Sequence, residues 1–446
     1  MTAEIAIMNK TAIALAADSA VTIAAGSANQ KIYNSVNKLF TLSKYHPIGV
    51  MVYGGAELMG IPWESIIKIY RNHLLEQNFS SLEEYGKDFM DFLDKENPLF
   101  PEKLQNDYFM GAILNYFTLI KEDINKAVKH TTEQKGQISK KNIKEIINSV
   151  IEKHYKIWKK ANILPHLDGK YASSILVKFG DYIIKCIPNV FQNLPILKKH
   201  LDQLKYICSN LFCKARFPSS HSGIVIAGFG EDDTFPVVNT YIVEAVVNKR
   251  LKYNKDKNKC EKISFKNSAT IIPFAQSQNV ATFLEGIALS CRKIIFSYLK
   301  ELFRNYPIKI LEKMKFNTEE EKKLLSKKLV NTTEEILNDF WQNIERFIRE
   351  KNVDPIINAV AFLPKDELAS MAESLVNLTS FKQKISMDSE TVGGPIDVAV
   401  ISKGDGFVWI RRKHYFDQEL NPHYMSKYFH NATRENKNEK KTRTKK

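Results

Sequence analysis

Hydrophobic and polar positions alternate with a period of two near the start of the chain, which is typical of β-strands. The pattern predicts four short strands before the first helix, over residues 2–8, 11–17, 38–42 and 48–53. On the first strand, Glu4 shares a face with Thr2 and Ala6. A turn at Asn9 and Lys10 joins the first two strands, so they are expected to form a hairpin. A polar loop is predicted over residues 26–34.

Apolar positions spaced by three and four residues then predict helices. An amphipathic helix follows Gly54-Gly55, and helical periodicity dominates residues 80–217. Further on, the pattern predicts strands over residues 223–228, 237–247 and 270–274, a charged loop over 250–262, helices over 280–303 and 365–381 with charged helices between them, and closing strands over 396–402 and 406–412. The order of strands and helices, without an internal repeat, predicts an α+β fold with helices packed on two faces of mainly antiparallel sheets.

The net charge of +15 changes this picture little, because a third of it lies at the end of the chain and the rest is spread thinly. Residues 434–446 contain seven Lys or Arg against two Glu, a net charge of +5, without hydrophobic periodicity. This tail is predicted to be disordered. Nucleic-acid binding requires a clustered basic face, and none is evident outside the tail. Nucleic acid is therefore not expected as the main partner, although a basic nucleic-acid-binding protein stays as a third alternative.

The five cysteines form no CxxC pair, which favours a reducing, cytoplasmic location over a disulfide framework. Charged residues interrupt the early apolar run, so no signal peptide is expected. No apolar stretch approaches the roughly 20 residues of a membrane helix. The ten histidines show no HxxxH or HExxH pattern, and no nucleotide-binding loop is present, so neither metal nor cofactor is expected.

Thr2 is the first candidate for chemistry, because removal of Met1 would leave a threonine at the N-terminus. Such a residue carries a hydroxyl and a free amine on adjacent carbons. The amine, with a reference pKa of about 7.7–8.0, can act through water as the base for the hydroxyl. A threonine at position 2 is common, however, and by itself it predicts nothing.

Three further features lie at spacings that would bring them to Thr2. In a hairpin that starts at Thr2, Asp18 at the end of the second strand returns to the start of the first. Its carboxylate could hold the ammonium of Lys38, which would stabilise negative charge on the hydroxyl. Gly54-Gly55 offers backbone N–H groups of the kind that form an oxyanion hole. Each feature also has an ordinary structural interpretation, as a turn residue, a solvated charge and a bend.

Together these residues resemble the proteasome β-subunit family of N-terminal-nucleophile hydrolases, which includes the bacterial HslV peptidase. The family pattern is an N-terminal Thr, an Asp sixteen residues later, a Lys, and a Gly-Gly before the first helix. Lys31 is the alternative for the lysine. The resemblance implies further site residues late in the chain, namely Ser277 before a helix, and Asp388 and Thr391 before Gly393-Gly394.

The late motifs depart from the family pattern. Gln276 and Gln278 replace the glycines that usually flank the serine. Alignment on Gly393-Gly394 puts Ser389 and Val392 at the positions of the family's Asp and Ser. Asp388 and Thr391 could therefore serve only if the loop shifts by one residue.

The resemblance implies an αββα four-layer sandwich of antiparallel sheets with large helical insertions. Its expected parts are residues 1–79 with the nucleophile, a helical insertion over 80–217, a second half over 218–428 with helical elaboration over 304–360, and the tail over 429–446. The expected activity is threonine-type hydrolysis of amide, most simply peptide, bonds. The resemblance also implies a homo-oligomer, with ring size and any ATPase partner left open. A non-catalytic structural subunit of the same fold is the first alternative.

Overall fold

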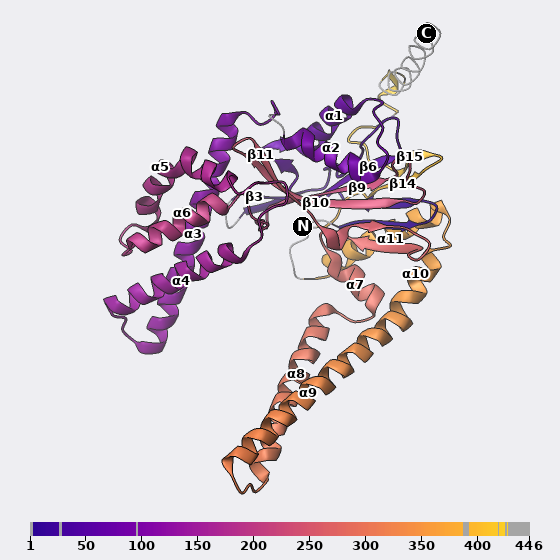
Figure 1. Ribbon diagram of the computed structural model, residues 1–446. Helices are drawn as coiled ribbons and strands as arrows, with labels where there is room; N and C mark the ends of the chain where they lie inside the picture. Colours follow the sequence, from indigo (N-terminus) through magenta and orange to yellow (C-terminus); the bar gives the residue numbers. More distant parts are fainter. Residues whose placement is uncertain are drawn as a thin grey trace.

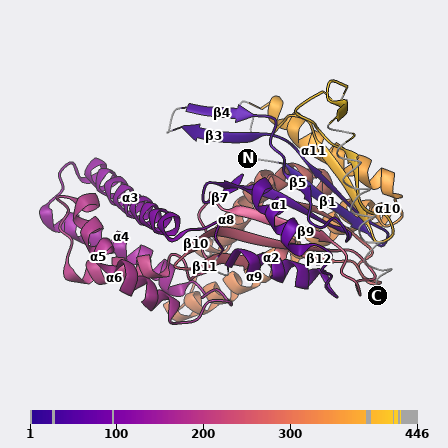
Figure 2. The same cartoon turned by 90° about the horizontal axis from the view of Figure 1, so that it is seen from above.

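A computed structural model of the chain describes residues 3–25, 29–94, 97–386, 392–417, 419–423 and 426 of 446. Figure 1 shows stacked sheets with helices around them, a group of helices to one side, and a long helical hairpin that projects from the body. Figure 2, seen from above, shows the helical group extending away from the sheets. The predicted α+β mixture of helices and antiparallel sheets is confirmed.

The first sheet joins the two ends of the described chain. Its strands are β1 (Glu4–Asn9), β2 (Ile13–Ala17), β13 (Ala269–Pro273), β14 (Asp397–Ser402) and β15 (Gly406–Arg411). They are all antiparallel in the order β13-β1-β2-β14-β15. The N-terminal hairpin is therefore held between β13 and the C-terminal hairpin.

The second sheet is built from the middle of the chain. Its strands are β5 (Leu39–Thr41), β6 (Ile48–Gly54), β9 (Ser222–Gly228), β10 (Val237–Val247) and β11 (Arg250–Lys255), with β12 (Glu261–Lys262) paired to β10. These pairs are also antiparallel. A 3₁₀ turn (Lys257–Lys259) connects β11 to β12.

Alternation along β1 shows how the sheets are held together, because successive side chains point to opposite faces. Ile5 and Ile7 belong to a core that includes residues of α11 (Lys365–Lys384). Ala6 and Met8 belong to a second core, shared with Met51 of the other sheet. Both faces of β1 are thus buried, one against a helix and one against a sheet.

Helices cover the outer face of each sheet. The helices α7 (Ser277–Glu285), α10 (Asp354–Val360) and α11 share the core of the first sheet, where α11 lies against β1 and β2. The helices α1 (Trp63–Leu74) and α2 (Leu82–Asp94) share the core of the second sheet, where α2 lies against β10.

The helical group continues the core of the second sheet outward. It consists of α3 (Glu102–Lys135), α4 (Lys140–Lys160), α5 (Tyr171–Phe191) and α6 (Lys198–Asn210). The helix α3 contacts β10, and all four contribute buried side chains to the same continuous cluster. Among the helices that the structure describes, none has the length and apolar character needed to cross a membrane.

The projecting hairpin consists of α8 (Leu289–Lys313) and α9 (Glu319–Ile348), and a π-helical turn (Arg349–Val353) leads from α9 to α10. The single helix predicted over residues 280–303 is wrong. Gly286, at a φ of +73°, adopts the left-handed conformation that ends α7, and α8 begins three residues later.

Two predicted loops also contain strands. The segment predicted as a polar loop over residues 26–34 includes β4 (Asn29–Tyr33), which pairs with β3 (Val21–Ala25) in a two-stranded ribbon. The segment predicted as a charged loop over residues 250–262 includes β11 and β12, because its backbone pairs with β10 and Leu251 is buried. A further small hairpin, β7 (Glu57–Leu58) with β8 (Ile61–Pro62), precedes α1.

Candidate active site around Asp18 and Lys38

The β1–β2 hairpin places Asp18 opposite Ala3, because Glu4 pairs with Ala17 in the antiparallel register. The backbone N–H of Asp18 donates to the carbonyl of Ala3 at 3.1 Å. In return, the N–H of Ala3 donates to Oδ1 of Asp18, also at 3.1 Å. Thr2 precedes Ala3 and lies outside the described residues. The hairpin therefore fixes one carboxylate at the first residue of the described chain.

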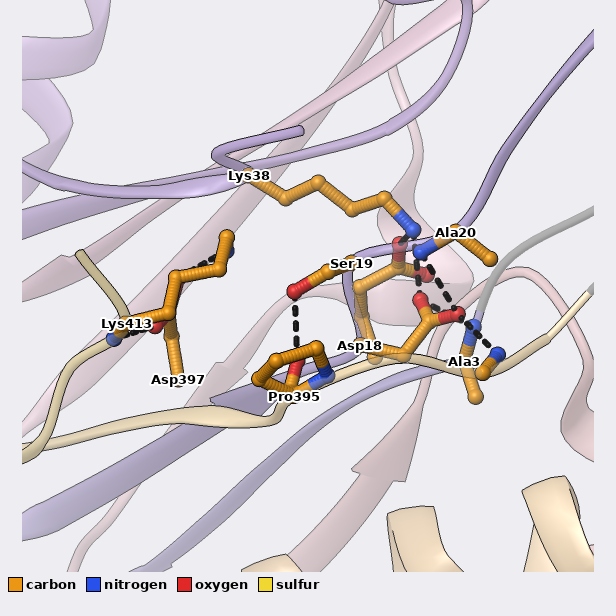
Figure 3. Close-up of polar contacts among 10 residues, drawn as sticks. Ala3, Asp18, Ser19, Ala20, Lys38, Pro395, Asp397 and Lys413 are labelled. Carbon is orange, nitrogen blue, oxygen red and sulfur yellow. Dashed lines mark hydrogen bonds and ion pairs between the residues drawn. The ribbon is translucent and has the colours of Figure 1, made fainter. Parts of the chain in front are cut away.

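Lys38 reaches the same carboxylate from the second sheet (Figure 3). Its backbone carbonyl accepts the N–H of Val52, which anchors Lys38 immediately before β5. Its Nζ lies 2.5 Å from Oδ1 of Asp18 and 3.5 Å from Oε1 of Glu4. Lys38 is 5% exposed and Asp18 1%, so the pair is almost free of solvent screening. The site is thus a buried ammonium between two carboxylates.

Glu4 is a site residue that the sequence analysis did not single out. Its side chain is buried on the β1 face that points toward the second sheet. The alternation of residues along the first strand could have indicated it, because it places Glu4 on a buried face, where a carboxylate requires a partner. Burial lowers the pKa of Lys259, and the charges of Asp256 and Glu4 oppose that shift. The ammonium of Lys259 lies over the ring of Tyr53, 4.8 Å from its centroid.

The second oxygen of Asp18 binds a loop from the far end of the sequence. Oδ2 accepts the N–H of Gly393 at 3.0 Å and that of Ala20 at 3.3 Å. The N–H of Ser19 donates to the carbonyl of Gly393 at 3.1 Å, and the Ser19 hydroxyl donates to the carbonyl of Pro395. One carboxylate therefore ties together the chain start, the residues before β5 and the loop before β14.

Only some of the residues predicted to act in that loop lie among those that the structure describes. Asp388, Ser389 and Thr391 lie outside the described residues. Val392, the first described residue after them, is buried in the core beneath α11. Its apolar side chain therefore packs in the core and has no polar role at Asp18.

A second buried ion pair lies one strand away from Asp18, and it too escaped the sequence analysis. Asp397 pairs with Ala17 in the β14–β2 register and is 2% exposed. Its Oδ1 accepts the N–H of Lys413 at 2.8 Å, and its Oδ2 pairs with the Lys413 ammonium (Figure 3). This pair anchors the segment after β15 next to the candidate site.

Gly54 ends β6 at a φ of +80°, a conformation that favours glycine. A Cβ on Gly54 would lie 2.5 Å from the carbonyl of His221. The neighbouring Gly55 N–H already donates to that carbonyl at 3.2 Å, which leaves Gly54 as the better candidate for an oxyanion donor. Gly54 and Lys38 both line a small cavity of about 20 Å³, which is room for about one water molecule.

Ser277 and Lys31 are the two remaining predicted residues. Ser277 begins α7, shortly after Phe274, whose N–H donates to the carbonyl of Glu4 at 2.8 Å. Within the described part of the chain, no hydrogen bond joins Ser277 to Asp18 or Lys38. Lys31, the alternative lysine, is exposed on β4 with its ammonium 5.1 Å from the ring centroid of Tyr33. Of the two lysines, Lys38 is therefore the one beside Asp18.

Neither a metal centre nor known relatives help to interpret this arrangement. No group of three or more His, Cys, Asp or Glu that could hold a metal ion occurs among the residues the structure describes. A scan against protein-family models finds no match, and a search of curated proteins finds no significant similarity. The chemistry proposed for the site therefore rests on its own geometry.

Proposed function

We propose that this protein is a proteasome-like N-terminal-nucleophile hydrolase that cleaves amide bonds, with Thr2 as the nucleophile after removal of Met1. One observation carries the proposal. Oδ1 of Asp18 accepts both the N–H of Ala3 and the ammonium of Lys38, inside the protein. The residue bonded to Thr2 and a buried positive charge thus share a single carboxylate oxygen.

In the proposed reaction, the Thr2 amine takes the proton of the Thr2 hydroxyl, through water, as Oγ attacks the amide carbonyl. The tetrahedral oxyanion is stabilised by the N–H of Gly54. Collapse of the intermediate breaks the C–N bond, and the leaving nitrogen takes the proton from the Thr2 ammonium. Water then attacks the ester and gives its proton to the amine. Expulsion of the carboxylic acid returns the proton to Oγ.

Lys38 supplies positive charge near the developing alkoxide. A buried ammonium acts more strongly on a nearby negative charge than a solvated one, because water screens it less. Asp18 and Glu4 offset the cost of burying that ammonium and fix its direction. Lys38 is thereby preorganised for charge stabilisation.

The fold is in keeping with this proposal. We assign the two stacked sheets and their outer helices to an αββα sandwich of the N-terminal-nucleophile type, enlarged by the helical group. In this assignment Asp18 comes from the first sheet, and Lys38 and Gly54 come from the second. The nucleophile would act at the junction of the two sheets.

The substrate and partners belong to the same proposal. We infer a peptide or related amide as substrate, a homo-oligomer as the working form and a cytoplasmic location. An ATPase partner is left open. A non-catalytic subunit of the same fold is the alternative, and an activity assay distinguishes it from the hydrolase.

The test measures both the removal of Met1 and the hydrolysis of peptide amides. Intact mass and N-terminal sequencing should find Thr2 as the first residue, and fluorogenic peptide amides should be hydrolysed. Thr2→Ala should abolish hydrolysis and Thr2→Ser should retain part of it, while Thr11→Ala, an exposed threonine on the first hairpin, should leave it unchanged. Hydrolysis that survives Thr2→Ala, or a retained Met1 in an active protein, would contradict the mechanism. A processed but inactive chain would favour the structural subunit.

A further inference from the structure

A cavity of about 680 Å³ lies between the helical group and the second sheet. Its lining comes from α3, α4, the segment 211–220 and the strands β10 and β11. This volume falls within the range of about 300–1,000 Å³ that is typical of small-molecule sites. The cavity is distinct from the small one beside Lys38, although His221, next to its lining residue Ser220, accepts the N–H of Gly55.

The walls of the cavity are mainly aromatic and aliphatic. They include Tyr108, Tyr116, Trp158, Phe212 and Phe217. The Trp158 indole N–H donates to the hydroxyl of Tyr116 at 2.6 Å, which fixes the orientation of both rings. Rigid aromatic walls of this kind suit a ligand with an aromatic or branched apolar group.

A buried ion pair forms part of the lining. The register of β10 with β11 shifts between Val243 and Ala245, so Glu244 occupies a β-bulge, a feature that redirects a side chain. Its Oε2 lies 2.6 Å from Nζ of Lys252. Burial raises the pKa of Glu244 and lowers that of Lys252, and the charge of each partner opposes the shift of the other.

The Lys252 ammonium is fully used by the protein. Besides Glu244, it donates to the backbone carbonyls of Leu211 and Arg216 at 2.6 and 2.5 Å. An ammonium has three N–H donors, so Lys252 has none left for a ligand. Its role is to neutralise Glu244 and to hold the backbone of Arg216 at the cavity.

Arg216 is the cation that this arrangement leaves available. Its guanidinium lies over the ring of Trp158, 5.9 Å from the centroid, and no carboxylate among the described residues pairs with it. Burial lowers the pKa of the neighbouring His154 against the opposing effect of Asp123, and the charges of Lys153 and then Arg216 lower that pKa further. Arg216 is exposed, as is Asp107 on α3, the other charge in the lining for which no ion pair is found among the described residues.

We propose that this cavity binds a carboxylate that carries an aromatic or branched apolar group, with Arg216 binding the carboxylate and the ring of Trp158 contributing to the apolar wall. A guanidinium that is held on a ring offers parallel N–H donors in the geometry that a carboxylate accepts. Glu244 and Lys252 cancel each other, so Arg216 is the cation of the lining that is left to bind an anionic group. The proposal goes beyond the hydrolase function and does not depend on it.

Calorimetric titration of the full chain with N-acetyl-L-phenylalanine tests the proposal, with the amide of the same compound as the neutral control. The acid should bind at least about tenfold more tightly than the amide, the difference expected for a charge-assisted hydrogen bond. Arg216→Gln should reduce the affinity for the acid to that for the amide. Arg304→Gln, an exposed arginine on α8 away from the cavity, should change neither affinity.

A cavity-filling pair provides the second arm. A Cβ on Gly111 of the cavity lining, and one on Gly180 of α5 outside it, would each meet no atom within 4 Å. Gly111→Leu should abolish binding, whereas Gly180→Leu should leave it intact. Gly180→Leu therefore controls for the effect of replacing a helical glycine by leucine outside the cavity. Equal affinity for acid and amide, tighter binding of 2-phenylethylamine, or no binding of the acid up to about 10 mM would overturn the proposal.

Discussion

The ammonium of Lys38 lies 2.5 Å from Oδ1 of Asp18, in a place where neither residue has appreciable contact with solvent. The two residues belong to different sheets, so their contact joins the N-terminal hairpin to the β5–β6 hairpin. The same carboxylate accepts backbone N–H groups from Ala3, Ala20 and Gly393. Asp18 is therefore both the candidate orienting group of the site and a structural link.

Loss of this link should destabilise the protein. Asp18→Asn leaves the buried ammonium with Glu4 as its remaining carboxylate, and removal of one partner of a buried ion pair costs about 3–5 kcal/mol. The denaturant midpoint of the variant should fall accordingly. Glu64→Gln, which breaks the partly exposed pair with Lys68, should cost at most about 0.5 kcal/mol. Equal midpoints for the two variants would show that Asp18 does not act as a link.

The two lysines named from the sequence should differ in their effect on activity. Lys38→Met removes the buried positive charge and should lower kcat/KM for a peptide amide by at least about 100-fold, as does loss of one preorganised charge-stabilising group. Lys31→Met, on the exposed face of β4, should leave kcat/KM within about twofold of the wild type. Steady-state kinetics with a fluorogenic peptide measure both. An equal loss in both variants would count against the role of Lys38.

Gly54 should be intolerant of any side chain for two separable reasons. Gly54→Ala places a Cβ at a φ of +80° and 2.5 Å from the His221 carbonyl. Gly60→Ala is the matched control, because Gly60 has a φ of +84° but its Cβ would meet nothing within 4 Å.

The left-handed conformation alone should cost about 1–2 kcal/mol in Gly60→Ala. Gly54→Ala should exceed that loss of unfolding free energy, and it should also lose activity because the clash displaces the end of β6. Indistinguishable denaturant midpoints would contradict the close approach to His221.

The hairpin that carries Asp18 could be predicted from the sequence, because its determinants are local. Alternation over residues 2–8 and 11–17 defines two strands, and the short turn between them favours their pairing as a hairpin. The return of Asp18 to Ala3 follows from that register. The sequence order of strands and helices likewise indicated antiparallel sheets with helices on their faces.

The rest of the site depends on contacts that no local pattern encodes. Gly393 meets Asp18 across 375 residues, and Glu4 meets Lys38 across the gap between two sheets. The hydrogen bond from the Gly55 N–H to the His221 carbonyl forms because β9 is the strand that pairs with β6. The ion pair of Glu244 with Lys252 depends on a β-bulge in β10 opposite β11. The charged pattern of residues 250–262 predicted a loop, so β11 could not be expected from the sequence.

Three histidines on or between the helices of the helical group should make the protein sensitive to mild acid. Burial lowers the pKa of His154, His166 and His200, so each binds a proton less readily in the folded than in the unfolded chain. Stability from these groups is therefore fully present above the unfolded pKa of about 6.5. It is lost as the pH falls from there through the lower folded values.

The denaturant midpoint should accordingly decrease between about pH 7.5 and pH 5.5. His154→Gln removes one of the titrating groups and should reduce that decrease, whatever it does to the midpoint at the higher pH. His73→Gln, an exposed histidine at the end of α1, should leave the pH dependence as it is in the wild type. A midpoint that rises on acidification, or a dependence unchanged by His154→Gln, would show that burial of this imidazole does not control the acid response.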